Sequence, residues 1–454
     1  MGLVAHGLGG VQDLPVPTWM FYWGAAIVLI VSFALLGGLW RRPLLERHAD
    51  GRRAPRWLER GVLWPPVKIV VQALAAALLA LVWVAALFGD PDPFRNLAPT
   101  WIYVVFWLGV PLLSVLIGDV WRVLNPWRAI ADGAVWLLER VTGREARPLT
   151  AYPDRAGRWP GAVLLFAFVA LELAYAEPSS ARALAFAIAL YTYVTLFGYV
   201  SFGREIWQDR GEGFGIAFAF LARTAPVRLD HGRLVLRWPL TGLHGAERMA
   251  GSLAVVAVLL GSVGFDGLSR TSWWQDLLAD VEGPFLVDSP DTAELLVMLV
   301  NVAGLTATVV LVAAAYRGAC ALMRSTVAAP RSLVPDFVRS LLPIAFVYAV
   351  AHYFSLFVIQ GQFAIRLVSD PLGRGWDLLG TAGYTPNLTP FSPDTIWYVQ
   401  AAALVAGHVA GLAVAHDRAV SIFRDRRDAL RSQYAMLALM VLYTVGGLWI
   451  LSRG

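Results

Sequence analysis

Residues 341–362 read LLPIAFVYAVAHYFSLFVIQGQ, and residues 396–417 read IWYVQAAALVAGHVAGLAVAHD. Each segment is about 20 residues long and apolar without alternation, which is the length that an α-helix needs to cross the hydrocarbon core of a bilayer. The loop between them contains SDPLGRGWDLLG at residues 369–380. Each helix also carries a histidine, His352 or His408, in sequence that otherwise suits lipid. The pattern predicts two membrane-spanning helices with polar groups at depth.

The rest of the chain continues this pattern. Of its 454 residues, 58% are hydrophobic and 15% are charged, which is too apolar for a soluble globular domain. Only helices and closed barrels satisfy every backbone hydrogen bond in hydrocarbon, and the apolar segments lack the alternation of barrel strands. We therefore predict an all-α fold, a polytopic transmembrane helical bundle of about ten spans. It forms a single integral membrane domain over residues 1–454.

Three segments are predicted to lie outside the spans. Residues 204–248 form a cytoplasmic amphipathic and β-hairpin insertion. In it, RGEGFGIAFAFLARTAP is expected to be an interfacial or re-entrant helix, and VRLDHGRLVLRW a small β-hairpin. Residues 266–291 and 361–394 form outer loops, and the first of these is expected to contain a short helix lying over the bundle.

Basic residues are distributed unevenly between the two sides. Most of the 37 Lys and Arg residues fall in the loops of one side, including the run from Arg41 to Arg60. The positive-inside rule makes this side cytoplasmic, so both termini are predicted to lie outside. The excess of basic residues behind the net charge of +5 is therefore explained by the cytoplasmic loops. We expect the lipid bilayer as a partner, and no nucleic acid.

Four strongly polar side chains share one depth in the predicted membrane. Glu172, Asn301, His352 and His408 all lie roughly 12 to 18 Å from the inner boundary, at about 1.5 Å rise per residue. Ionisable groups at such depth usually face a cavity or one another, which predicts a mid-membrane polar site. The competing interpretation is a histidine that only donates to a nearby carbonyl. It applies most to His408, because a Gly-x-x-x-Gly motif over residues 407–411 is typical of a close helix contact.

The polar half of the segment 341–362 suggests which residues contact a substrate. Tyr348, His352, Tyr353 and Gln360 fall on one side of the helix at about 100° per residue. Asn301, within the membrane, and Asp370 and Trp376, in the outer loop, are added to this group. The predicted substrate-binding residues are therefore Asn301, Tyr348, Tyr353, Gln360, Asp370 and Trp376.

A metal site is one use of the intramembrane groups. Neutral histidine nitrogens and a carboxylate are ligands that a zinc-like divalent ion prefers, and an open position would activate water. We expect Glu172, His352 and His408 to bind such an ion, and Glu172 and His352 to be catalytic, although no HExxH-type spacing supports this. An alternative metal site or substrate mouth at the outer end comprises His6, Asp13, Asp266, Asp370 and Asp377.

Five motifs carry a family resemblance: HGLGGVQDLPVP (6–17), FDGLS (265–269), AHYFSL (351–356), SDPLGRGWDLLG (369–380) and GHVAGLAVAHDRA (407–419). Together they resemble a family of bacterial integral membrane proteins, common in actinobacteria, that is named fenitrothion hydrolase. The resemblance covers essentially the whole chain. It implies a multi-pass protein of the bacterial inner (plasma) membrane that hydrolyses a small lipophilic aryl phosphotriester or thiophosphotriester and releases a phenol. It carries over no catalytic residues.

Two other functions use the same residues. In a transporter, Glu172 and His352 would form a proton relay or a substrate-coupling pair. Helix interruptions at Gly109 and Pro111 suit a moving bundle, but the two halves of the chain show no repeat, a feature of many transporters. In a membrane redox protein, His352 and His408 would be axial ligands of haem.

Overall fold

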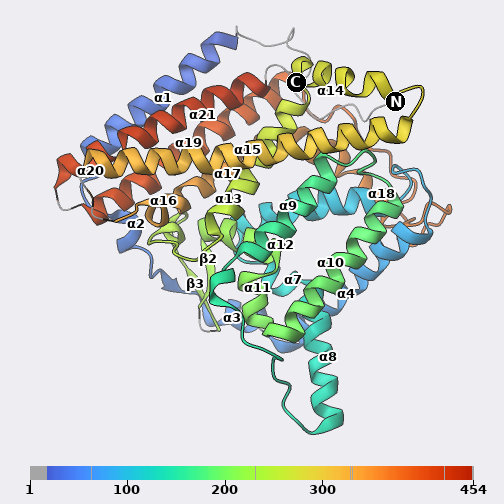
Figure 1. Ribbon diagram of the computed structural model, residues 1–454. Helices are drawn as coiled ribbons and strands as arrows, with labels where there is room; N and C mark the ends of the chain where they lie inside the picture. Colours follow the sequence, from blue (N-terminus) through green and yellow to red (C-terminus); the bar gives the residue numbers. More distant parts are fainter. Residues whose placement is uncertain are drawn as a thin grey trace.

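Helices dominate the structure, a computed structural model (Figure 1) that describes residues 18–451 except for 63, 231, 328, 330 and 424. Eight helices in these described ranges are long and apolar enough to cross a membrane, which confirms the predicted helical bundle. They are Pro65–Phe88, Leu97–Leu116, Ala181–Phe202, Ser252–Ser269, Pro290–Thr326, Val334–Gln360, Pro393–Ile422 and Arg426–Trp449.

The remaining two predicted spans coincide with the shorter apolar helices Trp23–Leu39 and Trp159–Leu173. Several spans are single helices: α1 (Thr18–Leu39), α4 (Pro65–Phe88), α9 (Trp159–Leu173), α10 (Ala181–Phe202), α13 (Ser252–Ser269), α15 (Pro290–Thr326) and α19 (Pro393–Ile422). The others are composite: α5 (Leu97–Thr100) with η2 (Trp101–Gly109) and α6 (Val110–Leu116); α16 (Val334–Phe337) with η7 (Val338–Leu341) and α17 (Leu342–Gln360); and α20 (Arg426–Ser432) with α21 (Tyr434–Leu451).

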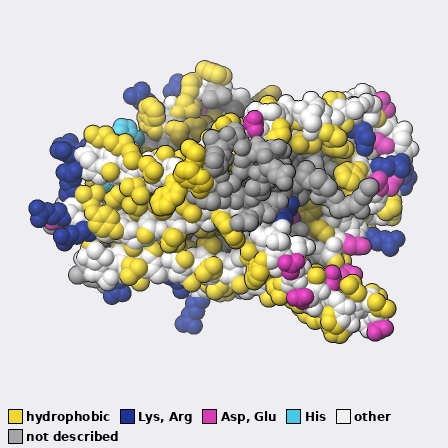
Figure 2. Space-filling model, turned by 90° about the horizontal axis from the view of Figure 1, so that it is seen from above, with side chains coloured by type: hydrophobic (Ala, Val, Ile, Leu, Met, Phe, Trp, Pro, Cys, Tyr) yellow, Lys and Arg dark blue, Asp and Glu magenta, His cyan; other side chains and the backbone are white. Residues whose placement is uncertain are grey.

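Short elements connect the spans at both ends of the bundle. At the end predicted to be cytoplasmic these are α2 (Leu44–Arg47), α3 (Arg56–Val62), α7 (Trp121–Leu124), α8 (Pro126–Thr142), η3 (Asp154–Ala156), α11 (Arg204–Arg210), η4 (Ala222–Thr224) and η5 (Thr241–Leu243). At the other end they are α14 (Ser272–Glu282), η6 (Gly283–Phe285) and α18 (Phe363–Leu367). On the face in Figure 2, Lys and Arg gather at the left end, and most of the visible Asp and Glu lie toward the right. On this face, Lys and Arg therefore predominate at the left end, and at the right end they lie among Asp and Glu.

A small antiparallel sheet lies at the basic end. The predicted hairpin is confirmed as β2 (Val227–Asp230) and β3 (Arg233–Leu236), with Val227 opposite Leu236. A third strand, β1 (Arg52–Arg53), pairs with the other edge of β3, so the strand order is β1-β3-β2. The first basic loop thus contributes to the sheet, a long-range pairing that local sequence patterns do not reveal.

The segment predicted as an interfacial or re-entrant helix is α12 (Gly213–Leu221), and nearly all of its side chains are buried. Glu212 caps it: its carboxylate accepts from the backbone N–H groups of Phe214 and Gly215 at 3.1 and 2.7 Å and from the indole N–H of Trp121 at 3.1 Å. The interfacial, amphipathic interpretation was wrong for this part of 204–248, because an interfacial helix keeps one polar face and α12 has none.

A buried carboxylate joins three arginines near the predicted cytoplasmic end. Glu247 lies 2.8 Å from Arg158, 3.1 Å from Arg339 and 3.7 Å from Arg223. Burial alone would raise the pKa of Glu247, but the three guanidinium groups outweigh this and lower it below the ordinary value of 4.5. The cluster connects the start of α9, η4 and η7, and so fixes the inner ends of three segments.

The contact between α17 and α19 is as close as the Gly-x-x-x-Gly motif predicts. A Cβ added at Gly407 would lie 1.9 Å from Val347 Cγ2, and one added at Gly411 would lie 2.9 Å from the Ser340 carbonyl oxygen. Only glycine permits this approach of the two backbones.

The predicted outer loop 266–291 begins later than expected. Helix α13 continues to Ser269, so Asp266 belongs to the last turns of a span. The expected short helix follows as α14 and packs against α15. The second outer loop, 361–394, contains α18 and a turn in which Asp370 accepts from the backbone N–H groups of Arg374 and Gly375 at 2.9 and 2.7 Å.

Candidate functional site

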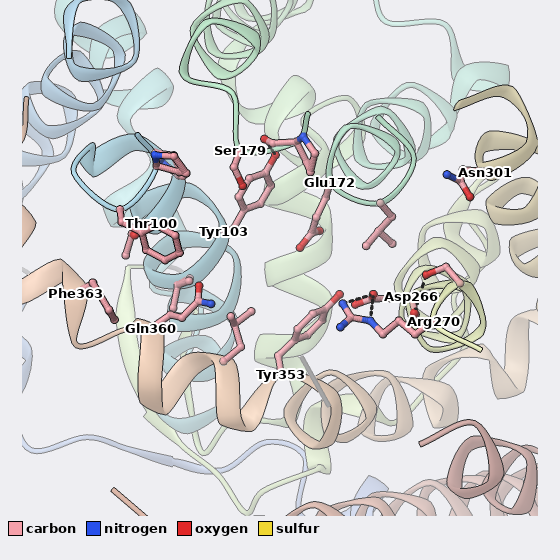
Figure 3. A pocket seen from close by; sticks show the side chains of 18 of the residues that line it. Thr100, Tyr103, Glu172, Ser179, Asp266, Arg270, Asn301, Tyr353, Gln360 and Phe363 are labelled. Atoms are coloured by element: carbon pink, nitrogen blue, oxygen red, sulfur yellow. Dashed lines mark hydrogen bonds and ion pairs between the residues drawn. The ribbon is translucent and has the colours of Figure 1, made fainter. Parts of the chain in front are cut away.

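A pocket of about 380 Å³ lies at the end of the bundle that carries α14 and α18 (Figure 3). This volume is within the range of small-molecule sites. Its walls come from η2, α9, α13, α14, α15 and α17, with α18 and the turn before α10 at the rim. Its polar side chains are those of Thr100, Tyr103, Glu172, Ser179, Asp266, Ser269, Arg270, Gln275, Asn301, Tyr353 and Gln360.

Glu172 occupies the next-to-last position of α9 and points into the pocket. In Figure 3 its carboxyl group lies in the space bounded by Tyr103, Tyr353 and Asp266. Its buried Oε2 atom has no hydrogen-bond partner among the described residues. Buried polar atoms are nearly always paired, so an orphaned carboxyl oxygen facing a pocket is available to a bound molecule or a proton.

Asp266 is held from two sides. His352 Nε2 lies 2.8 Å from Oδ2, and because a carboxylate only accepts, Nε2 carries the proton in this contact. Arg270 donates to Oδ1 from Nε and from a terminal nitrogen at 3.0 and 2.8 Å. The side chains of Asp266 and His352 are 4% and 6% exposed, whereas that of Arg270 is 29% exposed. Asp266 and Arg270 line the pocket, and His352 supports Asp266 from behind.

The wall opposite Arg270 is formed by η2, which is a π-helix of nine residues. Such segments are wider than an α-helix and occur frequently at functional sites. Pro111 follows within the first turn of α6, where it cannot donate a backbone hydrogen bond. Tyr103 donates from its hydroxyl group to the Pro178 carbonyl oxygen at 2.8 Å, which joins this wall to the turn between α9 and α10.

Three of the predicted substrate-binding residues line the pocket: Asn301, Tyr353 and Gln360. Asn301 also accepts from the indole N–H of Trp274 at 2.9 Å, which fixes the orientation of its amide. The depth argument thus brought together Glu172, Asn301 and the helix face of Tyr353.

Three other predicted substrate-binding residues lie elsewhere. Tyr348 is buried against Tyr443, with ring centroids 5.4 Å apart. Asp370 stabilises the turn of its own loop, and Trp376 is 41% exposed on that loop. Their role in binding a substrate stays a prediction. For Tyr348 the position differs because helix periodicity gives a direction around the helix axis but does not identify the neighbouring helix. Of the alternative outer cluster, Asp266 is at the pocket, and His6 and Asp13 lie outside the described residues.

The predicted metal ligands do not converge. No group of three or more His, Cys, Asp or Glu side chains in the described part of the chain has the geometry to hold a metal ion. His408 Nδ1 bonds to the Leu404 carbonyl oxygen of its own helix at 2.8 Å, and the ring packs 6.2 Å from that of Tyr443. The interpretation of His408 as a helix-packing residue therefore fits, and a three-ligand site with Glu172 and His352 does not. Haem ligation through His352 Nε2 would likewise have to displace Asp266.

Sequence reasoning missed two residues of the site. Arg270 falls within the predicted outer loop 266–291, but it follows Asp266 at a spacing of four residues, which places the two side chains on one helix face. That spacing was a usable signal. Tyr103 lies in an apolar segment without polar periodicity, within the π-helix η2, and no signal in the sequence points to it.

Comparison with known proteins adds no relative: no protein-family model, no curated protein and no solved structure matches the chain.

Proposed function

We propose that the protein is a hydrolase of the bacterial plasma membrane that cleaves small lipophilic phosphotriesters, with aryl phosphotriesters as the first class to test. One observation carries the proposal, namely the unpaired Glu172 carboxyl oxygen beside the Asp266–Arg270–His352 network in a membrane pocket. The family resemblance of the sequence supports the choice of substrate. A neutral triester partitions into lipid and can approach a pocket at this depth.

Glu172 is the general base in this proposal. Its Oε2 takes a proton from water as the water oxygen forms a bond to phosphorus. The bond from phosphorus to the aryl oxygen breaks, and the electron pair leaves with the phenolate. The proton on Glu172 then passes to the phenolate, so that water is consumed and a phosphodiester and a phenol are released. General-base catalysis of this kind contributes about 10²- to 10⁴-fold to the rate.

Arg270 supplies the electrostatic part. It lines the pocket, and its guanidinium group stabilises the charge that develops on the phosphoryl oxygen or sulfur. Asp266 and His352 are positioning residues, since they fix Arg270 and do not contact the reacting atoms. No step requires a metal ion, in keeping with the donor geometry.

The orientation follows from the basic end being cytoplasmic. The pocket then lies toward the outer side of the membrane, and both termini lie outside. The start of α1 and the end of α21 lie toward the same end of the bundle as α14 (Figure 1), so in this orientation both would face the outer side.

Turnover of a chromogenic aryl phosphotriester by the purified protein tests the proposal. Glu172→Gln keeps the shape of the side chain and should lower kcat by about 10²-fold or more. Glu177→Gln is the matched control, because Glu177 is exposed in the turn after α9 and does not line the pocket. His352→Ala should lower kcat less and change the pH profile. Equal activity of wild type and Glu172→Gln would overturn the assignment.

A proton-coupled transporter is a second candidate, favoured by the π-helix in the pocket wall and by Pro111 at the start of α6, where the backbone departs from regular α-helix. Glu172 would then carry a proton in place of activating water. In proteoliposomes, a pH gradient should drive solute flux that Glu172→Gln abolishes and Glu177→Gln preserves. Flux without cleavage would favour the transporter, and cleavage without flux the hydrolase.

A further inference from the structure

A second and larger cavity, of about 970 Å³, lies on the other side of the wall formed by η2 and α9. Helices α4 and α10 complete it, and its lining is almost entirely apolar. Within η2, Tyr103 and Val104 line the polar pocket, whereas Ile102 and Val105 line this cavity. The two spaces therefore share one helical wall.

The cavity opens on the surface that faces lipid. Three of its lining side chains, Leu74, Phe186 and Leu190, are 63%, 71% and 50% exposed. Along α10 its lining runs from Arg182 to Val194, a length of roughly 18 Å at the helical rise. Half of the bilayer hydrocarbon core is about 15 Å thick. The cavity is thus about as long as the acyl layer of one leaflet.

The inner end of the cavity is closed by aromatic residues whose polar atoms are already paired. Trp127 donates from its indole nitrogen to Thr192 at 2.8 Å, and Tyr191 donates from its hydroxyl group to Glu212. The rings therefore present mainly apolar surface to the cavity. An occupant at this depth is accordingly a hydrocarbon chain.

The outer end of the cavity has the opposite character. Arg182, in the first turn of α10, is exposed and has no ion pair or side-chain hydrogen bond among the described residues. Ser180 precedes the helix, and within the described chain its hydroxyl group makes no capping hydrogen bond. The guanidinium group of Arg182 and the hydroxyl group of Ser180 therefore lie at the N-terminus of a 22-residue helix, whose first backbone N–H groups have no partner within the helix. This combination is complementary to a phosphate group.

We propose that the cavity binds one hydrocarbon chain of an anionic phospholipid of the outer leaflet, with the lipid phosphate at Arg182. Two features favour this occupant: the positive charge of Arg182 at the mouth of the cavity is complementary to the phosphate, and the apolar lining is long enough for an acyl chain. The bound head group would lie beside Pro178 and Ser179, which line the polar pocket. Lipid occupancy would therefore stabilise the wall that contains Tyr103, whether or not the polar pocket is catalytic.

Native mass spectrometry of the delipidated protein with added phosphatidylglycerol or phosphatidylcholine tests this. Wild type should retain phosphatidylglycerol in preference to phosphatidylcholine. Arg182→Ala should weaken phosphatidylglycerol binding about tenfold, the effect of one lost charge-assisted contact. Arg95→Ala is the control, because Arg95 is an outer arginine that pairs with Asp90 and does not line the cavity.

A second pair of variants tests the chain site. Ala187→Trp fills the cavity and should reduce retention of both lipids, whereas Ala189→Trp, two residues along and exposed outside it, should not. Unchanged selectivity in Arg182→Ala overturns the head-group contact. Retention in Ala187→Trp equal to that in Ala189→Trp overturns the chain site. Neither result depends on turnover, so failure of the hydrolase proposal remains distinguishable.

Discussion

Replacing Asp266 by Asn removes the carboxylate that joins His352 and Arg270. Breaking a buried ion pair from one side costs about 3 to 5 kcal/mol, because the remaining charge loses its partner. Here the Arg270 side chain, 29% exposed, can recruit water. We therefore expect Asp266→Asn to lower the free energy of unfolding by about 3 kcal/mol, at the low end of that range.

The contribution of the Asp266–His352 contact is separated by a double-mutant cycle. A buried hydrogen bond to a charged group contributes about 1.5 to 3 kcal/mol, so Asp266→Asn and His352→Ala should couple by about 2 kcal/mol. The assay is reversible unfolding in mixed detergent micelles, with all four proteins at one pH and detergent ratio. If the two substitutions add within about 0.5 kcal/mol, the contact is not energetically important and the positioning role of His352 is wrong.

Three further predictions test packing, charge and chemistry. Gly407→Ala should destabilise the protein by about 1 to 3 kcal/mol because its Cβ meets Val347, whereas Gly446→Ala, whose Cβ meets nothing within 4 Å, should stabilise helix α21 by up to about 1 kcal/mol in the same unfolding assay. Glu247 has a lowered pKa in the folded protein, so in acid the unfolded chain binds more protons than the folded chain. As the pH is lowered past about 4.5, the free energy of unfolding of wild type should therefore decrease, and that of Glu247→Gln should decrease less steeply. Dialysis against a chelator should leave phosphotriester turnover unchanged, and a loss restored by zinc would contradict the metal-free step.

The fold was largely predictable because the membrane imposes strong constraints on sequence. A helix must satisfy its backbone internally and span about 30 Å, so apolar segments near 20 residues identify themselves. The exceptions are instructive. Helix α12 is apolar and only 9 residues long, and its burial depends on the distant cap contacts of Glu212 with Trp121. Strand β1 depends on a partner far along the chain.

For the candidate site, the sequence predicted only the depth of each side chain in the membrane. Hydropathy and helical rise predict the depth of a side chain in the membrane, and of the four side chains grouped in this way, Glu172 and Asn301 line one pocket. The pocket lies near the ends of α9 and α13, so the mid-membrane position itself stays a prediction. The depth of a residue does not show which helices are neighbours. For this reason His408 was grouped with Glu172 and His352, although it bonds to the Leu404 carbonyl oxygen of its own helix.

The pairing of His352 with Asp266 depends on where helix α13 ends and on which helix lies beside it, and the sequence pattern shows neither. The predicted depth grouped His352 with Glu172, whereas Asp266 was assigned to the outer loop and to the alternative outer cluster. Because α13 extends to Ser269, Asp266 lies within the bundle and requires partners there. Its burial is tolerated through the contacts to His352 and Arg270, and these three groups are then satisfied by one another. Glu172 has no such compensation among the described residues, which makes its Oε2 the atom where a substrate or a proton has most to gain.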